Sequence, residues 1–422
     1  AIAAVIFIIT AGALTQWGNV ASASSAQAKY AALTGSPLYE RLIALIRTSN
    51  DFDRDGYGSL LGERDCAPFN KSIYPGARDI PDNGRDENCD GRDFSLRDLE
   101  PPPGGSLPVP AGFVRNDWNV LLLTVDTVRY DRTSFGGYRD GPAKRDTTPN
   151  LAKFAERSVA FTFAQAPSAG TMASIPAILT SKFFHSGVAL EMTGVPHGMP
   201  PRLTAANLTL PEIMKAAGYY TGVIATHEYW NDWGMDQGVD SYDNSIGAKA
   251  DPFRVVADKT TNHILSFVSA HQNEKWFLWA HYIDPHGRYV AHPDVVDWGT
   301  SEPDLYDSEL RWTDQEIGRM FDELSRIPGG DRTIIVLTSD HGESMGEHNV
   351  PSGTHGTALY NTLLHVPFMI YVPNNLPRQV PGAVTNLDIV PTIAELTGID
   401  VSEHSFEGRS LVPQIFYGKA DL

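Results

Sequence analysis

The stretch TIIVLTSDHGE, residues Thr333–Glu343, gives the strongest indication of the fold. Its first seven residues are apolar or carry small hydroxyl groups, which is typical of a strand covered on both faces of a sheet. Asp340 and His341 follow directly, where such a strand would end. In open α/β sheets, ligands bind at the carboxyl ends of parallel strands. The stretch therefore predicts a buried parallel strand with a functional Asp–His pair at its carboxyl end.

Four further apolar runs predict companion strands of the same sheet. They are NVLLLTV (Asn119–Val125), YTGVIA (Tyr220–Ala225), KWFLWAH (Lys275–His281) and VPFMIYV (Val366–Val372). Helical patterns lie between the runs, at Asn150–Val159 and Ser308–Leu324. This alternation predicts an α/β domain over residues 118–422, with a mostly parallel sheet and helices on both faces.

Composition limits the class of protein. The chain has 422 residues, of which 42% are hydrophobic, enough for one large core. It has 33 Lys and Arg against 51 Asp and Glu, a formal net charge of -18. Because phosphate backbones repel such a chain, we expect no nucleic-acid partner.

The N-terminal segments are predicted to lie outside the α/β domain. Residues 1–28 begin AIAAVIFIIT and carry no charge, which favours the end of a transmembrane segment. A signal peptide is the alternative, because Ala26–Ala28 resembles a cleavage site. Residues 29–50 are predicted to form an amphipathic helix and linker, and residues 94–117, which include PPPGGSLPVP, a Pro/Gly linker. We therefore expect a membrane-anchored protein whose α/β domain is extracytoplasmic, in the periplasm or at the cell surface.

Residues 51–93 form an acidic, glycine-rich module that holds both cysteines, Cys66 and Cys89. Alternating oxygen-bearing side chains before a glycine repeat the first half of a calcium loop. The expected calcium ligands are Asp51, Asp53, Asp55, Tyr57, Asp65, Asp86, Asn88, Asp90 and Asp93. A disulfide between the cysteines would fit an oxidising compartment. Gly62 stands where a calcium loop has its closing glutamate, and a solvated acidic linker is the alternative. The DC…PGA…DENCDG pattern resembles a metal-binding repeat of bacterial surface proteins.

Asp126, which follows the run Asn119–Val125, completes a second candidate site with Asp340 and His341. Two carboxylates and an imidazole are a common ligand set for divalent metals. A single aspartate after a strand is often a helix cap or turn former. The adjacent pair Asp340–His341 is harder to explain in that way.

Five ordered blocks resemble the sulfatase/alkaline phosphatase superfamily. They are NVLLLTVDTVRYDR, TTPNLAKFAERSVAFTFAQAPSAGTMASIPAILTS, HYIDPHGRY, LTSDHGESMGEH with HGTALYNTLLHVPFMIY, and NLDIVPTIAELTGI. The resemblance extends from about Trp118 to Gly418. It implies an alkaline-phosphatase-like fold and metal-dependent ester cleavage.

The resemblance also assigns roles to residues. It implies four metal ligands, which are Asp126, Asp340, His341 and Thr171. It also implies three catalytic residues: Thr171 as the nucleophile, His286 at the transferred group and His355 near the leaving-group oxygen. His281 and His348 match less well, and structural hydrogen bonding is their alternative role.

The sequence departs from formylglycine sulfatases at the nucleophile. Those enzymes carry a Cys or Ser within C/S-x-P-x-R that is oxidised to an aldehyde, whereas Thr171–Ile175 reads TMASI. Threonine cannot form that aldehyde. Thr127 also replaces a second aspartate of many calcium sulfatases. The set is more similar to phosphonate monoesterases and to phosphoethanolamine or phosphoglycerol transferases, which use zinc or manganese. An imidazole ligand likewise favours zinc or manganese, with calcium as the alternative.

The residues around Thr171 give a separate physical argument. Residues 171–180 predict a helix, whose first N–H groups and positive dipole end would face an anionic group. A metal can lower the pKa of an alcohol enough for it to attack. The alternative is that Thr171 is an ordinary N-cap residue. Ser168 and Ser174 are the other candidate nucleophiles.

These observations predict a hydrolase or phosphotransferase that cleaves phosphoric, sulfuric or phosphonic esters through a covalent Thr171 intermediate. One alternative is a true sulfuric ester hydrolase similar to arylsulfatases. Another is a non-catalytic, calcium-stabilised surface protein. The expected substrate is a small-molecule, lipid or glycan ester.

Overall fold

The structure is a computed structural model. It describes Thr48 and residues 51–58, 65–75, 77, 80, 83–87, 89, 91, 93, 109–110, 113, 115–138, 144–191, 202–227, 230, 233–247 and 255–418. The chain divides into two compact units, Ala1–Gly105 and Ser106–Leu422. The predicted segments 1–28 and 29–50, apart from Thr48, lie outside the described residues, as does most of the predicted linker 94–117. Within the described part of the chain, no helix is both long and apolar enough to cross a membrane.

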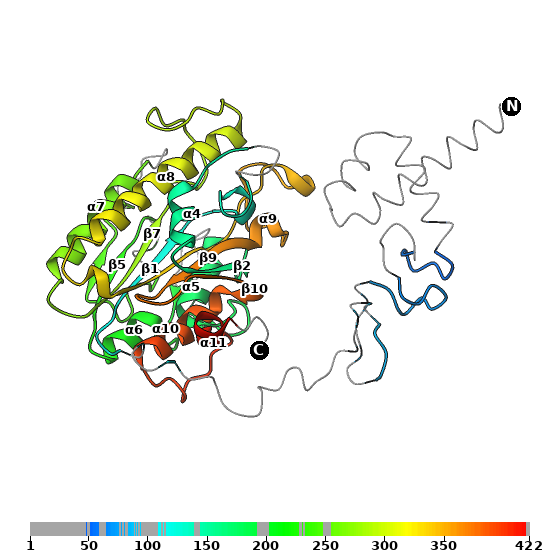
Figure 1. The fold of residues 1–422 in the computed structure, drawn as a ribbon, viewed down its shortest axis with the longest axis horizontal. Coiled ribbons are helices and arrows are strands. Elements are labelled where there is room, and N and C mark those ends of the chain that lie inside the picture. Colours follow the sequence, from blue (N-terminus) through cyan, green and yellow to red (C-terminus); the bar gives the residue numbers. More distant parts are fainter. Residues whose placement is uncertain are drawn as a thin grey trace. The chain divides into compact units, whose positions relative to one another are not determined.

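The larger unit is built on an eight-stranded sheet with the order β10-β2-β9-β8-β1-β7-β5-β6 (Figure 1). Its strands are β1 (Asn119–Val125), β2 (Val159–Gln165), β5 (Tyr220–Ile224), β6 (Ser241–Asp243), β7 (Trp276–Tyr282), β8 (Thr333–Ser339), β9 (His365–Tyr371) and β10 (Arg378–Thr385). Neighbouring strands are parallel except β9, which is antiparallel to both β2 and β8. The short strands β3 (Leu190–Glu191) and β4 (Arg202–Leu203) form a separate two-stranded sheet. The predicted mostly parallel α/β fold is confirmed.

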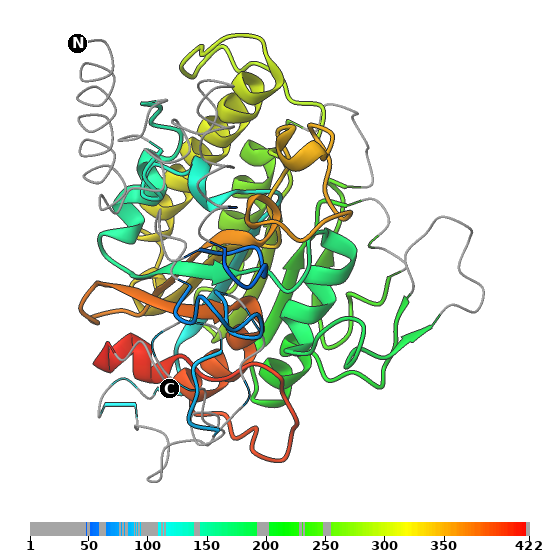
Figure 2. The same cartoon turned by 90° about the vertical axis from the view of Figure 1, so that its right-hand side faces the viewer.

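Helices cover both faces of the sheet, as Figure 1 and the turned view of Figure 2 show. On one face lie α4 (Pro149–Ala155), α7 (Ala257–Ala270) and α8 (Glu302–Leu324). On the other lie α5 (Thr171–Thr180), α6 (Leu210–Ala216), α10 (Ile389–Thr397) and α11 (Val412–Tyr417). The short helix α9 (Asn361–Leu364) precedes β9, and 3-10 turns occupy Tyr130–Arg132, Gly330–Arg332, Glu347–Asn349 and Asn386–Asp388.

Alternation along the strands explains why both faces need helices. In β1, Val120 and Leu122 pack into one hydrophobic cluster, whereas Leu121 and Leu123 pack into the cluster on the opposite face. All four side chains are fully buried. Successive side chains of a strand point to opposite faces, so a continuous apolar run requires cover on each side.

Element boundaries differ from the sequence predictions where polar chemistry sets them. Helix α8 begins at Glu302 rather than Ser308, because Ser301 and Asp304 form a capping box there. The helix predicted to end at Val159 ends at Ala155, because residues 159–165 form strand β2. Strands β2, β6 and β10 were not predicted. Strand β10 contains a register shift between Val380 and Ala383, which hides its alternation.

Candidate active site

The carboxyl ends of β1, β7 and β8 place the candidate site. Strand β1 lies between β8 and β7, with Val125 paired to Ser339 on one side and to Tyr282 on the other. Asp126 and Asp340 are the next residues of two adjacent parallel strands, so their side chains lie at the same edge of the sheet. Both are fully buried.

Four of the predicted residues meet around one imidazole nitrogen. His341 Nε2 lies 3.4 Å from Asp126 Oδ1 and 3.6 Å from Asp340 Oδ2. The Thr171 hydroxyl oxygen Oγ1 lies 3.0 Å from the same nitrogen. The structure therefore brings the predicted nucleophile and the predicted metal ligands together.

Thr171 is the first residue of α5, and the N-cap residue is Gly170. The alternative prediction that Thr171 is an N-cap is therefore wrong. A Cβ at Gly170 would lie 3.4 Å from the Gly356 Cα atom and 3.9 Å from the His355 ring. In addition, the Gly356 N–H donates to the Ala169 carbonyl at 2.6 Å. This close approach holds the loop of His355 against the start of α5.

The donor atoms fit a divalent cation. Asp126 Oδ1 and Asp340 Oδ2 are buried and have no hydrogen-bond partner among the described residues, which is costly unless a cation lies near. His341 Nδ1 donates to the Gly342 carbonyl at 2.7 Å, which leaves the Nε2 lone pair facing the carboxylates. Ligands at about 2.0–2.2 Å from a tetrahedral ion lie about 3.4 Å apart, close to the separations found here.

The pKa values of the site residues also favour a bound cation. Burial, and then repulsion from Asp126, raise the pKa of Asp340 to about 8. Burial alone would raise the pKa of Asp126 too, but the His286 imidazole and the contacts of His227 and His281 lower it well below its usual value. Burial lowers the pKa of His341 to about 4, so its imidazole is neutral at neutral pH. A cation between the two carboxylates would relieve their repulsion.

His286 and His355 form a second layer next to this group. The His355 ring lies 4.4 Å from the His341 ring and 5.0 Å from the His286 ring, measured between centroids. Burial lowers the pKa of His286. Thr127 donates its hydroxyl to the Pro285 carbonyl at 2.7 Å. Thr127 thereby holds the loop that carries His286.

Glu343, which the sequence analysis did not select, orients His355. The His355 Nδ1 atom lies 3.2 Å from one Glu343 carboxylate oxygen and 3.3 Å from the other. Tyr289 donates its hydroxyl to the same carboxylate at 3.1 Å. Burial alone would lower the pKa of His355, but the hydrogen bond to Glu343 and its negative charge raise it. Glu343 follows Asp340 by three residues, and that spacing alone carries no signal of this contact.

His227 was also missed, and His281 was given only a weak claim. His227 Nε2 lies 3.0 Å and His281 Nε2 3.2 Å from Asp126 Oδ2. His227 follows strand β5 by three residues, so the strand-end rule used for Asp126 and Asp340 could have found it. His348 is exposed and stacks on Tyr360, with 4.1 Å between ring centroids.

The alternative nucleophiles contact each other instead of the metal ligands. Ser174 donates its hydroxyl to the backbone carbonyl of Ser168 at 2.8 Å. This bond closes the turn at the start of α5. Ser174 therefore has a structural partner in the described structure, whereas Thr171 faces His341.

The acidic module shows the local contacts of a loop with clustered carboxylates. Asp51, Asp53 and Asp55 offer oxygen atoms within 4.8 Å of one another. Asp51 accepts the N–H groups of Asp55 at 3.1 Å and Gly56 at 3.0 Å, while Asp55 accepts that of Tyr57 at 2.9 Å. Both Asp53 carboxylate oxygens have no hydrogen-bond partner among the described residues.

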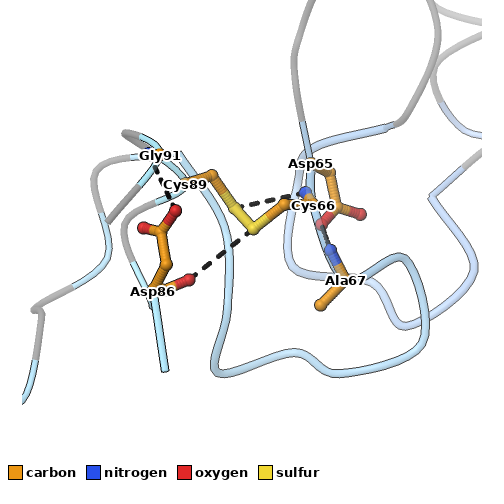
Figure 3. Close-up of a disulfide and its surroundings, with 6 residues drawn as sticks. All are labelled: Asp65, Cys66, Ala67, Asp86, Cys89 and Gly91. Carbon is orange, nitrogen blue, oxygen red and sulfur yellow. Dashed lines mark hydrogen bonds between the residues drawn. A yellow bond between two sulfur atoms is a disulfide. The ribbon is translucent and has the colours of Figure 1, made fainter. Parts of the chain in front are cut away.

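The second half of the module is organised by a disulfide between Cys66 and Cys89 (Figure 3). Asp65 Oδ1 accepts the Ala67 N–H at 2.9 Å, and Asp86 Oδ2 accepts the Gly91 N–H at 2.8 Å. The remaining predicted ligands are Asp93, which accepts the Gly84 N–H at 2.5 Å, and Asn88 and Asp90, which lie outside the described residues.

Comparison with known proteins gives the same assignment as the five blocks. The chain is 30% identical over 141 residues to the choline-sulfatase of Rhizobium meliloti (strain 1021), a match that covers 31% of this chain and 27% of the relative. This chain thus spans about a quarter of the length of that curated relative.

Solved structures support the fold. The phosphonate monoester hydrolase of Agrobacterium radiobacter superposes with a TM-score of 0.57 at 17% identity, covering 71% of this chain and 77% of that one. A protein in the alkaline phosphatase superfamily from Vibrio parahaemolyticus superposes with a TM-score of 0.53 at 20% identity, covering 70% of this chain and 69% of that one. The alkaline-phosphatase-like architecture is therefore confirmed.

The family model named Sulfatase matches residues 118–399, more than half of the chain. These residues include all the side chains that meet around Asp126, and the chain belongs to the Sulfatase family.

Proposed function

We propose that this protein cleaves phosphoric or phosphonic esters, with Thr171 as the covalent nucleophile. The observation that carries this proposal is the position of the Thr171 hydroxyl, 3.0 Å from His341 Nε2 at the start of α5. Thr171 is nearly buried, at 5% exposure, and its hydroxyl lies beside a ligand set of two carboxylates and one neutral imidazole. Nucleophilic alcohols in enzymes need such an activating neighbour.

The expected cofactor is one divalent cation held by Asp126, Asp340, His341 and Thr171. When bound, it would lower the pKa of the Thr171 hydroxyl and offset negative charge on the transferred group. The imidazole in the ligand set favours zinc or manganese over calcium. For the loop Asp51–Gly56, whose donors are all oxygen, we propose calcium.

The surrounding residues supply the remaining steps. The Thr171 hydroxyl releases its proton to bulk water, Oγ1 attacks the phosphorus atom as an alkoxide, and the bond from phosphorus to the leaving oxygen breaks. The first N–H groups of α5 and the ring of His286 hold the oxygens of the transferred group. His355 donates a proton to the leaving alcohol, and Glu343 keeps that imidazole oriented. Water or an acceptor hydroxyl then gives a proton to His355, attacks phosphorus and displaces Thr171 as its alkoxide. With water as the acceptor the protein is a hydrolase, and with another hydroxyl it is a transferase.

A sulfuric ester is the second candidate substrate, because a matched curated relative is named a choline-sulfatase. Thr171 favours phosphorus for a chemical reason. Threonine cannot be oxidised to the aldehyde of formylglycine sulfatases, so this chain lacks their route for releasing sulfate. The substrate's leaving group is proposed to be a small molecule, a lipid or a glycan.

We further propose that the protein acts outside the cytoplasm, tethered by residues 1–28. The disulfide of Cys66 and Cys89 supports an oxidising compartment. The clustered carboxylates Asp51, Asp53 and Asp55 support one that is rich in calcium.

The proposal is tested with metal-free protein reloaded with zinc, manganese or calcium. Aryl phosphate monoesters and diesters, an aryl phosphonate monoester and an aryl sulfate are offered to the wild type and to Thr171→Ala. We expect turnover of a phosphorus ester by the wild type only, and a quenched adduct on the peptide that contains Thr171, detected by mass spectrometry. Equal turnover in Thr171→Ala contradicts the nucleophile.

The other outcomes separate the alternatives. Cleavage of the sulfate alone selects the sulfuric ester hydrolase. If no ester is cleaved with any metal while calcium still binds the acidic module, the protein is the non-catalytic surface protein instead.

A further inference from the structure

The carboxylate of Asp126 faces imidazoles on both of its oxygens. Oδ1 faces His341 Nε2 at 3.4 Å, within the group proposed above to hold a cation. Oδ2 faces two other imidazole nitrogens, His227 Nε2 at 3.0 Å and His281 Nε2 at 3.2 Å. These three side chains are at most 2% exposed. One carboxylate therefore joins two separate groups of donor atoms.

The second group has the spacing of a transition-metal site. Its three donor atoms all lie within 4.8 Å of one another. Zinc bound at about 2.0–2.2 Å by tetrahedral ligands keeps those ligands about 3.4 Å apart. The two measured contacts to Oδ2 are close to that value. Two imidazoles and one carboxylate with a fourth position open is also a common zinc ligand set in enzymes.

The neighbours of His281 allow the required tautomer. His281 Nδ1 lies 2.8 Å from the Thr124 hydroxyl oxygen, which accepts a hydrogen bond from the Trp279 indole at 3.0 Å. A proton on Nδ1 would donate to this oxygen and leave the Nε2 lone pair facing Asp126. Hydrogen bonds of this kind to the second ring nitrogen orient histidine ligands in metal sites. The opposite tautomer would make Nε2 a simple hydrogen-bond donor, so an experiment must distinguish the two.

We propose that Asp126 bridges two divalent cations, the second of which is held by Asp126 Oδ2, His227 and His281. This inference rests on the proposed function for the first cation but adds a second binding site to it. The chemistry of the second donor set selects a borderline ion such as zinc over calcium or magnesium. Its three protein ligands leave a place for water or for an oxygen of the substrate.

The test counts cations, so it does not depend on turnover. Full-length protein is stripped of metal, saturated with calcium to fill the acidic module, and titrated with Co²⁺ as a visible probe. Binding is followed by calorimetry and by d–d absorption, and the bound metal is counted by elemental mass spectrometry. We expect two equivalents of Co²⁺ per wild-type chain.

Glutamine variants separate a metal ligand from a hydrogen-bond donor. The side-chain amide of Gln can still donate to Asp126 but binds transition metals poorly. His227→Gln and His281→Gln should each bind one equivalent of Co²⁺ tightly, and the affinity for the second equivalent should fall at least about 100-fold. Loss of a residue that only hydrogen-bonds to a metal ligand already lowers metal affinity about 10–100-fold, and here a ligand itself is lost. Asp340→Asn should weaken the other equivalent instead.

A matched control tests whether any Asp–His pair gives this result. His263 Nδ1 lies 2.6 Å from Asp243 Oδ2, but this pair is partly exposed, at 35% and 37%, and has no third ligand in the described structure. His263→Gln should therefore still bind two equivalents. Circular dichroism and thermal melting check that each variant is folded.

The outcomes also separate this inference from the proposed function. One equivalent in the wild type, lost in Asp340→Asn but unchanged in His227→Gln and His281→Gln, overturns the second site and leaves the proposed function intact. Two equivalents without turnover of any ester would uphold the second site and overturn the proposed function. Anomalous diffraction at the cobalt edge from wild-type crystals distinguishes the same outcomes without a variant. Two peaks beside Asp126 support the second site, and a single peak overturns it.

Discussion

The Thr171 hydroxyl oxygen lies 3.0 Å from His341 Nε2, although the two residues are separated by 170 positions in the chain. Helix α5 supplies Thr171 from the start of one element, and the carboxyl end of β8 supplies His341. The contact requires helix α5 to pack against the sheet so that its first residue lies at the carboxyl end of β8. The position of one hydroxyl is therefore set by the packing of the whole unit, and the variants below test what that position does.

The first prediction concerns the hydroxyl itself. Thr171→Ser keeps an oxygen at the start of α5 and should retain activity within about 10-fold, because only the methyl group that limits its rotamers is lost. Thr171→Ala should lower kcat by about 1,000-fold or more, as expected when a nucleophile is removed. Steady-state kinetics on a phosphorus ester measure both.

Ser174→Ala is the matched control for Thr171. Ser174 lies in the same first turn of α5, but its hydroxyl donates to the Ser168 carbonyl at 2.8 Å. Its loss should cost about 1 kcal/mol of stability and leave kcat nearly unchanged. If instead Ser174→Ala abolished turnover while Thr171→Ala did not, the nucleophile would be Ser174.

The second prediction concerns the pH dependence that Glu343 gives to His355. The hydrogen bond and charge of Glu343 raise the pKa of His355. A general acid must be protonated, so kcat falls as the pH rises through this pKa. Glu343→Gln removes the charge, lowers the pKa of His355 and should move the alkaline limb of the profile to lower pH. If the alkaline limb of the kcat profile lies at the same pH in Glu343→Gln as in the wild type, this role of Glu343 is contradicted.

Tyr289→Phe provides a milder comparison for Glu343. Its hydroxyl donates to Glu343 at 3.1 Å, which stabilises the carboxylate. Because the carboxylate charge remains, the alkaline limb should shift less than in Glu343→Gln. A loss of activity at every pH in both variants, with no shift of the limb, would indicate a structural role only.

The sequence predicted those parts of the site that follow a simple local rule. Asp126 and Asp340 directly follow apolar strands, and both lie where that rule places them. The start of α5 at Thr171 was predicted as well. His227 lies three residues after β5, so it follows the same rule less directly, and only that rule could have indicated it.

Other contacts could not be predicted because they depend on packing between distant segments. Glu343 reaches His355 only because the two turns after β8 fold back on each other, as the bridge between Ser344 and Thr354 shows. Strand β10 was missed because Pro381 and Gly382 fall within its register shift, where a strand loses its alternating pattern. Chain order alone also gave no indication that β9 runs antiparallel to its neighbours.

The third prediction concerns stability and Asp284, which lies near the candidate site without joining it. Asp284 Oδ1 accepts the N–H groups of Val256 and Ala257, both at 2.9 Å, at the start of α7. Burial, and then repulsion from Glu309, raise the pKa of Asp284 to about 8. Between the unfolded pKa, about 3.9, and this value, the folded chain holds a proton that the unfolded chain does not. The tighter binding of this proton by the folded chain stabilises the fold. This stabilisation is complete below the unfolded pKa and is lost as the pH rises to about 8.

Asp284→Asn should remove this pH dependence, because an amide oxygen can accept the same N–H groups without charge. The free energy of unfolding of the wild type should fall relative to the variant by at most about 1.4 kcal/mol for each pH unit. Urea denaturation at several pH values measures the difference. Asp297 is exposed and accepts the Gly299 N–H at 2.9 Å, so Asp297→Asn is the control and should follow the wild type. A constant difference between wild type and Asp284→Asn across pH would contradict the prediction.

The fourth prediction concerns the acidic module. Asp51 and Asp55 use part of their oxygen atoms for backbone N–H groups, whereas both oxygens of Asp53 have no hydrogen-bond partner among the described residues. Calcium should therefore bind this loop and protect residues 51–93 from proteolysis, and Asp53→Asn should weaken binding at least about 10-fold, since one charged ligand becomes neutral. Calorimetry with calcium and limited proteolysis, read by mass spectrometry, measure both effects. Asp117→Asn is the control, because Asp117 already pairs with Arg115 at 2.7 Å. Equal calcium affinity in Asp53→Asn and Asp117→Asn would mean that Asp51, Asp53 and Asp55 form only a solvated acidic loop.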